Sequence, residues 1–225
     1  MSLGLGVVLP NGAILASDTR QRNVFEPPNY EDVPGKLERL TDQLWAVRIG
    51  ITVVTKVALD RVREDLTQDL GPREVSDLVR DATRLAWEEF ARKFNLDQDS
   101  ELAAIVLVGG LAQGHAFLCG AYQTCYRGQG VPRFILLEPF NFAVFGGKAT
   151  GGHYNTLENG LKAIKGCPAD PVPSVLELIR AVMEEAAQSD PDVGGEIEYV
   201  VVRQGSVVEL DSLGVIKNAK PINSR

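Results

Sequence analysis

Residues 2–20 read S-L-G-L-G-V-V-L-P-N-G-A-I-L-A-S-D-T-R, and the rest of the chain is organised around them. Two apolar runs, Leu3–Leu9 and Ala13–Ala16, flank the triplet Pro10-Asn11-Gly12. Asn-Gly between β-prone runs is a strong local signal for a hairpin. The chain is therefore expected to enter a sheet at once, with Ser2 at the start of the first strand.

The composition narrows the possible classes of protein. A net charge of −7 argues against a nucleic-acid or an anionic membrane surface as partner. Hydrophobic residues make up 44% of the chain, which is enough for the core of one domain spanning 1–225. No apolar run reaches the ~20 residues of a membrane span, and no signal peptide is recognised. A cytoplasmic protein with no nucleic-acid and no membrane partner is therefore expected.

The cysteines and histidines show no metal-binding pattern. Cys119, Cys125 and Cys167 lack metal-ligand spacing. Cys119 and Cys125 could face each other across a hairpin, but free thiols are the expectation for a cytosolic protein. His115 and His153 are expected at surface or satisfied core positions. Because no Gly-Lys-Ser/Thr follows the Gly-Gly pairs, no phosphate loop is recognised, and neither a cofactor nor a metal is expected.

Hydrophobic periodicity divides the chain into blocks of strands and helices. The predicted strands pair as hairpins: 3–9 with 13–16, 36–40 with 44–49, 102–108 with 115–122, 133–137 with 141–145, and 196–203 with 206–210. The predicted helices come in two pairs: 53–70 with 72–94, and 150–165 with 174–188. Ser174 to Glu177 forms a capping box at the start of the last helix. The segments 21–35 and 216–225 are expected to be a loop and a tail.

Helix pairs between blocks of antiparallel hairpins predict an α+β fold. The predicted architecture is a four-layer αββα sandwich, in which two stacked antiparallel sheets are flanked by a helix pair on each outer face. This order of elements resembles that of the proteasome β subunit and its bacterial relatives, HslV and the ancestral β-type subunit. The resemblance covers most of the chain and implies the N-terminal nucleophile (Ntn) hydrolase fold.

The resemblance also assigns residues to a catalytic site. In such subunits the mature chain begins with the nucleophile, and an Asp-Ser/Thr-Arg triplet follows at a fixed distance. Aligned without a gap, Asp18-Thr19-Arg20 puts Ser2 at the nucleophile position. The family's lysine at the start of the third strand corresponds to Lys36. Its glycine at the end of the fourth strand corresponds to Gly50.

These residue types supply the parts that amide hydrolysis needs. After removal of Met1, the Ser2 hydroxyl would attack, and the serine's own α-amine, with a reference pKa of about 8, would accept the proton. Lys36 would stabilise the developing alkoxide, and Asp18 would hold the lysine charged and oriented. The backbone N–H of Gly50 would point into the oxyanion hole.

The sequence departs from the family pattern at three places. The nucleophile would be Ser where Thr is usual. The Gly-Ser-Gly turn after the eighth strand reads Gly146-Gly147-Lys148 here, and the ancestral β-type subunits also depart there and carry a nearby lysine. The Asp-x-x-Ser-Gly motif of the last loop corresponds roughly to 190–194. Both Asp190 and Asp192 are candidates for the aspartate that orients the nucleophile.

The resemblance further implies a substrate pocket beside the nucleophile. Its lining, carried over from the family, consists of Gln21, Pro34, Glu38, Arg48 and Thr52. Arg48 and Gly50 alternate along one strand and are expected to face the same side. Arg48 would favour an acidic or polar substrate side chain, unless Glu38 neutralises it.

The function that the resemblance implies is that of a threonine-type peptidase with a serine nucleophile, acting on peptides or unfolded proteins. The partners it implies are further copies in a homo-oligomeric ring or helix, and an ATP-dependent unfoldase. Two alternatives stay open: a non-catalytic structural subunit of a proteasome-like assembly, and an amidase of small substrates on the same fold. Retention of Met1 would favour the structural subunit, whereas an intact set of Ser2, Lys36 and Asp18 favours the enzyme.

Overall fold

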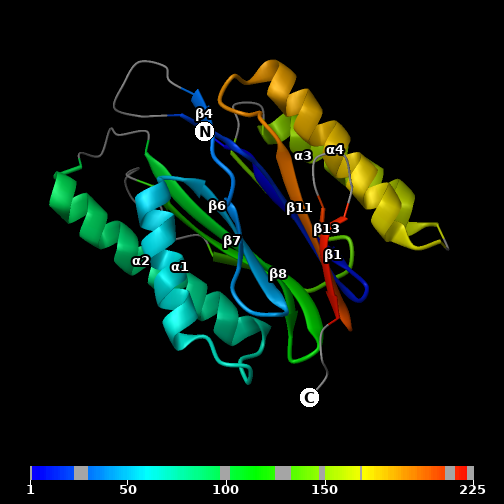
Figure 1. The fold of residues 1–225 in the computed structure, drawn as a ribbon, viewed down its shortest axis with the longest axis horizontal. Coiled ribbons are helices and arrows are strands. Elements are labelled where there is room, and N and C mark those ends of the chain that lie inside the picture. The colour runs from blue at the N-terminus through cyan, green and yellow to red at the C-terminus, as the bar shows by residue number, and fades with distance from the viewer. Residues whose placement is uncertain are drawn as a thin grey trace.

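The computed structural model describes residues 2–22, 30–96, 102–124, 133–146, 150–167, 169–210 and 216–221. These residues form an α+β fold with two main antiparallel sheets and four helices (Figure 1). A small third sheet pairs β3 (Arg20–Arg22) with β4 (Tyr30–Asp32).

The larger sheet has six strands and is built around the hairpin at the start of the chain. Its strand order is β10 (Phe142–Phe145), β1 (Gly4–Leu9), β2 (Gly12–Asp18), β11 (Ile197–Arg203), β12 (Ser206–Leu210) and β13 (Ile216–Pro221). The predicted hairpin of β1 and β2 is confirmed, with Leu9 opposite Gly12 next to the turn. Because every residue of both strands is buried, this hairpin forms the middle of the molecule.

The second sheet has five strands and carries the other half of the candidate site. Its strand order is β5 (Leu37–Arg39), β6 (Leu44–Gly50), β7 (Ala103–Ala112), β8 (His115–Thr124) and β9 (Arg133–Leu136). The β6–β7 register pairs Gly50 with Ala104, so β6 ends beside the start of β7. The segment just before β5 contains Lys36.

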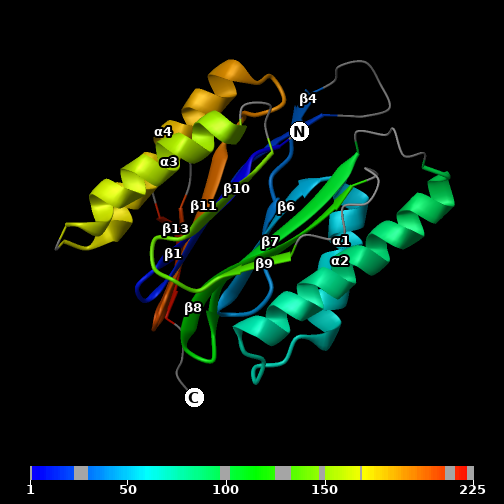
Figure 2. The same cartoon turned by 180° about the vertical axis from the view of Figure 1, so that it is seen from behind.

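A pair of helices packs against each sheet (Figure 2). The bounds of the helices are α1 (Thr52–Asp65), α2 (Pro72–Phe94), α3 (Thr150–Lys165) and α4 (Pro171–Ser189). One apolar cluster joins α1 and α2 to the five-stranded sheet, and another joins α3 and α4 to the six-stranded sheet. A third cluster contains residues of both sheets. None of the described helices is long and apolar enough to cross a bilayer.

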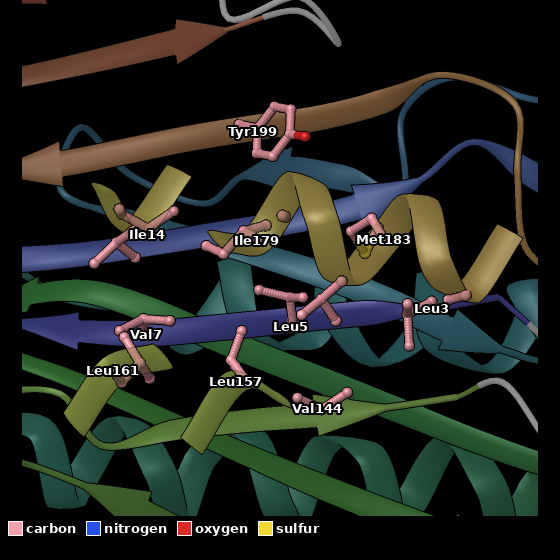
Figure 3. Packing of buried hydrophobic residues seen from close by; sticks show 14 of the residues in the cluster. Leu3, Leu5, Val7, Ile14, Val144, Leu157, Leu161, Ile179, Met183 and Tyr199 are labelled. Carbon is pink, nitrogen blue, oxygen red and sulfur yellow. The ribbon is translucent and has the colours of Figure 1, made fainter. Parts of the chain in front are cut away.

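The two faces of strand β1 pack against different parts of the molecule, which explains why large apolar residues alternate with glycines at its start. Leu3, Leu5 and Val7 belong to the cluster with α3 and α4 (Figure 3). The intervening glycines face the other sheet: a Cβ on Gly4 would meet the side chains of Val47 and Ile49 in β6. The absence of that Cβ lets β1 lie close to β6. The start of β1, and Ser2 with it, is thereby brought near the end of β6.

One predicted strand pairing is wrong. The segments 133–137 and 141–145 do not form a hairpin, because β9 pairs with β8 in the five-stranded sheet and β10 pairs with β1 in the six-stranded sheet. The turn between them carries the chain from one sheet to the other, and the N–H of Phe140 donates to the carbonyl of Val8 in β1 at 2.7 Å. Local periodicity indicates strands but leaves their partners to long-range packing.

Two segments expected to be irregular contain strands. Within 21–35 the chain forms part of β3 and all of β4, and 216–221 forms β13, which pairs with β12. These strands are polar and lie at sheet edges, where lysine and proline are common and the apolar alternation of buried strands is absent. The hydrophobic pattern therefore gave no signal for them.

Two helix ends also differ from the prediction. Helix α4 begins at Pro171 instead of Ser174, because the Asp170 side chain caps it by accepting the N–H of Val172 at 3.2 Å. Proline in the first helical turn loses no hydrogen bond, so Asp170 and Pro171 make the stronger start. Helix α1 ends at Asp65, before the predicted end at 70.

Candidate active site

Ser2 lies just before β1, with its hydroxyl between two groups. The Lys36 Nζ donates a hydrogen bond to Ser2 Oγ at 2.7 Å. The Ser2 hydroxyl donates to the backbone carbonyl of Arg20 at 3.1 Å. The hydroxyl is therefore fixed in place and in direct contact with an amine.

Lys36 connects the nucleophile candidate to a buried carboxylate. Its Nζ lies 3.2 Å from Asp18 Oδ1, and it also donates to the Arg20 carbonyl that the Ser2 hydroxyl reaches. The residue is only 7% exposed. Its backbone is held as well, because the Lys36 carbonyl accepts the N–H of Arg48 in β6 at 2.9 Å.

Asp18, at the end of β2, is the hub of the cluster. Its Oδ1 accepts the N–H of Leu3 at 3.0 Å, and its Oδ2 accepts the N–H of Gly194 at 3.1 Å. With Lys36 as a third partner, this carboxylate is compensated although it is 1% exposed. Asp18 thereby ties together the first strand, the loop after α4 and the lysine.

Burial shifts the pKa values of the two ionisable groups toward their neutral forms. Desolvation lowers the pKa of Lys36 from its usual 10.5, against the opposing effect of the Asp18 carboxylate. Desolvation likewise raises the pKa of Asp18, against Lys36 and the two backbone N–H groups. A lysine with a lowered pKa can lose its proton and then accept one from a hydroxyl in contact with it. The sequence-based interpretation gave this lysine only the part of a cation.

Gly50 ends β6 in a conformation that favours glycine, with φ of +86°. A Cβ at this position would overlap the backbone carbonyl of Ala103 in β7. The chain turns here from β6 into α1, and Gly50 lines the same cavity as Ser2. The role of the Gly50 N–H as a donor in an oxyanion hole stays a prediction.

A small cavity of about 40 Å³ lies beside Ser2. The residues that line it are Ser2, Gln21, Val33, Pro34, Lys36, Arg48, Gly50, Thr52 and Thr55. Four of the five residues expected to line the pocket are therefore next to the candidate nucleophile, and the fifth, Glu38, is not among the lining residues. Val33 and Thr55 were not predicted. Thr55 follows Thr52 at helical spacing, a signal by which it could have been found.

Of the two interpretations of Arg48, binding of an acidic substrate side chain or neutralisation by Glu38, the structure contains the ion pair that the second requires. The Arg48 guanidinium Nε pairs with Glu38 Oε1, and its Nη2 donates to the carbonyl of Gly35 at 2.6 Å. Glu38 also pairs with Arg63 of α1. The positive charge at the cavity wall is therefore matched by a carboxylate.

Asp190 and Asp192 lie in the loop after α4, and both are buried. Asp190 Oδ1 accepts the N–H of Asp192 at 3.0 Å, and Asp192 Oδ1 accepts the hydroxyl of Tyr30 at 3.1 Å. The loop reaches the cluster through the N–H of Gly194, which donates to Asp18 Oδ2. The assignment of Asp190 as the orienting aspartate stays a prediction.

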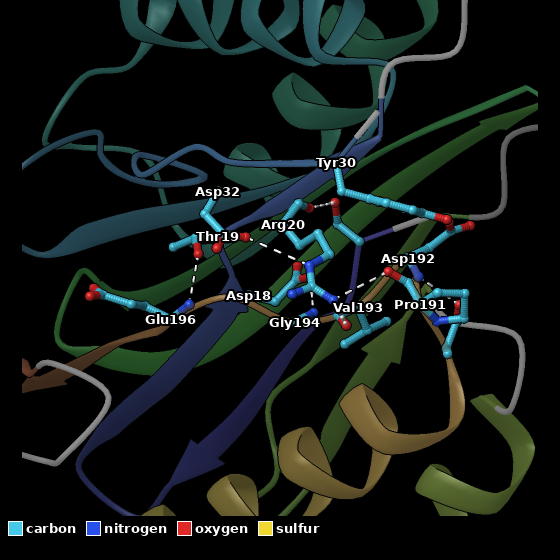
Figure 4. A network of polar contacts seen from close by, with 12 residues as sticks. Asp18, Thr19, Arg20, Tyr30, Asp32, Pro191, Asp192, Val193, Gly194 and Glu196 are labelled. Carbon is cyan, nitrogen blue, oxygen red and sulfur yellow. Dashed lines mark hydrogen bonds and ion pairs between the residues drawn. The ribbon is translucent and has the colours of Figure 1, made fainter. Parts of the chain in front are cut away.

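The residues after Asp18 hold this loop against the sheet (Figure 4). Thr19 Oγ1 accepts the N–H of Glu196 at 2.8 Å. The Arg20 guanidinium donates to the carbonyls of Pro191 and Val193, each at 3.4 Å, and pairs with Asp32 of β4 at 3.6 Å. The Asp-Thr-Arg triplet thus has a physical use: Asp18 receives the loop's N–H, and the next two side chains fix the loop's position.

The described residues include only some of the other residues singled out in the sequence. Met1, Cys125 and the pair 147–148 fall outside the described residues. Cys119 and Cys167 are free thiols. His115 is exposed. His153 is buried, and neither ring nitrogen has a hydrogen-bond partner among the described residues, so the expectation of a satisfied core position is wrong.

No protein-family model matches the sequence, and no curated protein matches it. Solved structures do match. Anbu from Hyphomicrobium sp. strain MC1 has a TM-score of 0.63 at 14% identity, covering 99% of this chain and 88% of that one. The helical assembly of the Anbu complex from Pseudomonas aeruginosa has a TM-score of 0.70 at 16% identity, covering 98% and 86%. Anbu (ancestral beta-subunit) from Yersinia bercovieri has a TM-score of 0.65 at 12% identity, covering 98% of this chain and 86% of that one. The predicted likeness to ancestral β-type subunits is therefore confirmed for the fold.

Proposed function

We propose that this chain is a proteasome-type peptidase that cleaves amide bonds with Ser2 as an N-terminal nucleophile, once Met1 has been removed. One observation carries the proposal: Lys36 Nζ contacts Ser2 Oγ at 2.7 Å while it pairs with the buried Asp18. The fold shared with Anbu supports it. So do the three apolar clusters, which fit the four-layer αββα order of a single Ntn-hydrolase domain.

In the proposed reaction, Ser2 Oγ attacks the carbonyl carbon of the scissile amide and gives up its proton to a base. The α-amine of Ser2 is one candidate base. Lys36 Nζ is another, because it is within direct proton-transfer distance and burial lowers its pKa. The same base then returns the proton to the leaving amine. Water hydrolyses the ester on Ser2 and regenerates the hydroxyl.

Gly50 would stabilise the oxyanion that forms when the carbonyl is attacked. One well-placed backbone donor in such a site contributes about 3 kcal/mol to lowering the barrier. Asp190 would orient the loop that delivers Gly194 to Asp18. In this scheme every step uses only protein groups and water.

The first test concerns the chemical state of Ser2. The intact mass of protein isolated from its native host should lack Met1. Incubation with a β-lactone that acylates activated hydroxyl groups should then add one probe per chain at Ser2 Oγ, and Ser2→Ala should abolish that labelling. A mass that retains Met1 would favour a non-catalytic subunit. Turnover of small amides without turnover of unfolded casein would favour the amidase.

Hydrolysis should increase as the pH rises through the pKa of Lys36, because only the neutral amine can accept the hydroxyl proton. That pKa lies below 10.5, so the increase belongs at lower pH than for a solvated lysine. The carboxylate of Glu198 raises this pKa. Glu198→Gln should therefore move the increase to lower pH, whereas Glu64→Gln on the exposed side of α1 should leave it in place. A kcat profile measured from pH 5 to 10 tests this, and an upward shift in Glu198→Gln would contradict it.

Assembly into a homo-oligomer is also proposed, because the structure from Pseudomonas aeruginosa is described as a helical assembly. On α1, Val53 and Val57 lie one turn apart and are 54% and 36% exposed. Exposed valines at this spacing suit contact with another copy. We expect six or more copies in sedimentation velocity at micromolar concentration, and smaller species for Val53→Asp. A single 24.4 kDa species in the wild type would count against assembly. An ATP-dependent unfoldase would deliver folded substrates to such an assembly.

A further inference from the structure

The cavity that Ser2 lines also contains in its wall an arginine, Arg48, that is held by other protein groups. The Arg48 side chain is only 14% exposed. Its Nε pairs with Glu38, and its Nη2 donates to the Gly35 carbonyl at 2.6 Å. The guanidinium is therefore fixed by contacts on two of its nitrogens.

Glu38 lies between two cations, which holds it on Arg48. Its Oε1 pairs with Arg48, and its Oε2 pairs with Arg63 of α1. Arg63 in turn lies 2.9 Å from Asp60. This row of ion pairs contains two arginines and two carboxylates, so its charges balance. The charge of Arg48 at the cavity wall is thus neutralised by Glu38 behind it.

We propose that Glu38 is a specificity-determining residue, which neutralises Arg48 so that the cavity takes a small, uncharged substrate side chain on the acyl side of the cleaved bond. This inference rests on the proposed peptidase function. Under this proposal Glu38 neutralises Arg48, and Arg48 does not select an acidic substrate side chain. An acidic substrate side chain would bind only if Arg48 left Glu38, and it would then lie next to that carboxylate.

The size of the cavity points to the same substrate class. Its volume of about 40 Å³ corresponds to about three water-sized groups, since one water needs about 10–15 Å³. Alanine, serine and threonine side chains are of this size. The lining also combines the threonines Thr52 and Thr55 with Val33 and Pro34, which suits a small side chain of either polarity.

The test compares wild type with Glu38→Gln, which keeps the shape of the side chain and removes its charge. Peptide substrates differ only in the residue on the acyl side: alanine, serine, leucine, glutamate or lysine. Wild type should cleave fastest after alanine or serine. In Glu38→Gln, the ratio of kcat/KM for glutamate to that for alanine should increase by at least about tenfold. Glu64→Gln, which removes an exposed carboxylate of α1 outside the cavity lining, should leave the ratio unchanged.

A second measurement separates this inference from the proposed function. N-acetyl amino-acid methylamides are titrated into Ser2→Ala, and into Ser2→Ala combined with Glu38→Gln, with binding followed by NMR. The double variant should bind the glutamate derivative at least about tenfold more tightly relative to the alanine derivative. Absence of any turnover in wild type would overturn the peptidase, while this binding result would still support the inference. An unchanged binding ratio, or a wild-type preference for glutamate, would overturn the role of Glu38.

Discussion

Lys36→Ala is expected to abolish hydrolysis, with kcat/KM falling by at least about a thousandfold. The Nζ that contacts Ser2 Oγ at 2.7 Å would be missing, and with it a proton acceptor and a transition-state charge partner. Turnover is measured with the best peptide of the panel. Retention of wild-type turnover would reduce Lys36 to a structural residue.

The same substitution should also destabilise the fold, which the sequence did not indicate. In the structure Lys36 is the cationic partner of Asp18, which is 1% exposed. Removing one member of a buried ion pair commonly costs about 3–5 kcal/mol, because the other charge is left uncompensated. Urea unfolding should show this loss as a lower midpoint.

A double variant distinguishes lost chemistry from lost stability. Lys36→Met combined with Asp18→Asn removes both charges and keeps apolar volume near the cavity. It should regain part of the stability that Lys36→Met loses alone, because no uncompensated charge stays buried. It should remain without activity. Recovery of turnover together with stability would mean that the pair only supports the fold.

The extent of the sequence-based prediction follows from how local each signal is. The helices 72–94 and 150–165 have the bounds predicted for them, because their apolar spacing and flanking residues act within a few turns. The hairpin of β1 and β2 is equally local. The partners of β9 and β10 depend on the stacking of two sheets, which no short window of sequence contains.

The candidate site shows the same limit. Ser2, Lys36 and Gly50 come from three separate segments, and only comparison with a family pattern could suggest that they meet. The glycine that lets β1 approach β6, Gly4, has a role that is visible only once both sheets are in place. Likewise, the choice between the two readings of Arg48 depends on Arg63, which α1 supplies from a different element.

Gly50→Ala is expected to impair both stability and activity. The residue has φ of +86°, a region in which a side chain costs about 1–2 kcal/mol, and its Cβ would overlap the Ala103 carbonyl. The end of β6 must therefore move away from β7. Together these effects should lower the free energy of unfolding by about 2–4 kcal/mol.

The loss of activity should exceed what unfolding explains, because the displaced N–H is the proposed oxyanion donor. A shift of about 1 Å at a catalytic group can cost about a hundredfold in rate. Gly114→Ala is the matched control: Gly114 has φ of +77°, and a Cβ there would meet nothing within 4 Å. It should carry only the backbone strain and keep wild-type kcat. Both variants are assayed at a temperature where each is folded by circular dichroism. Equal kcat values in the two would remove Gly50 from the catalytic proposal and leave it as the turn between β6 and α1.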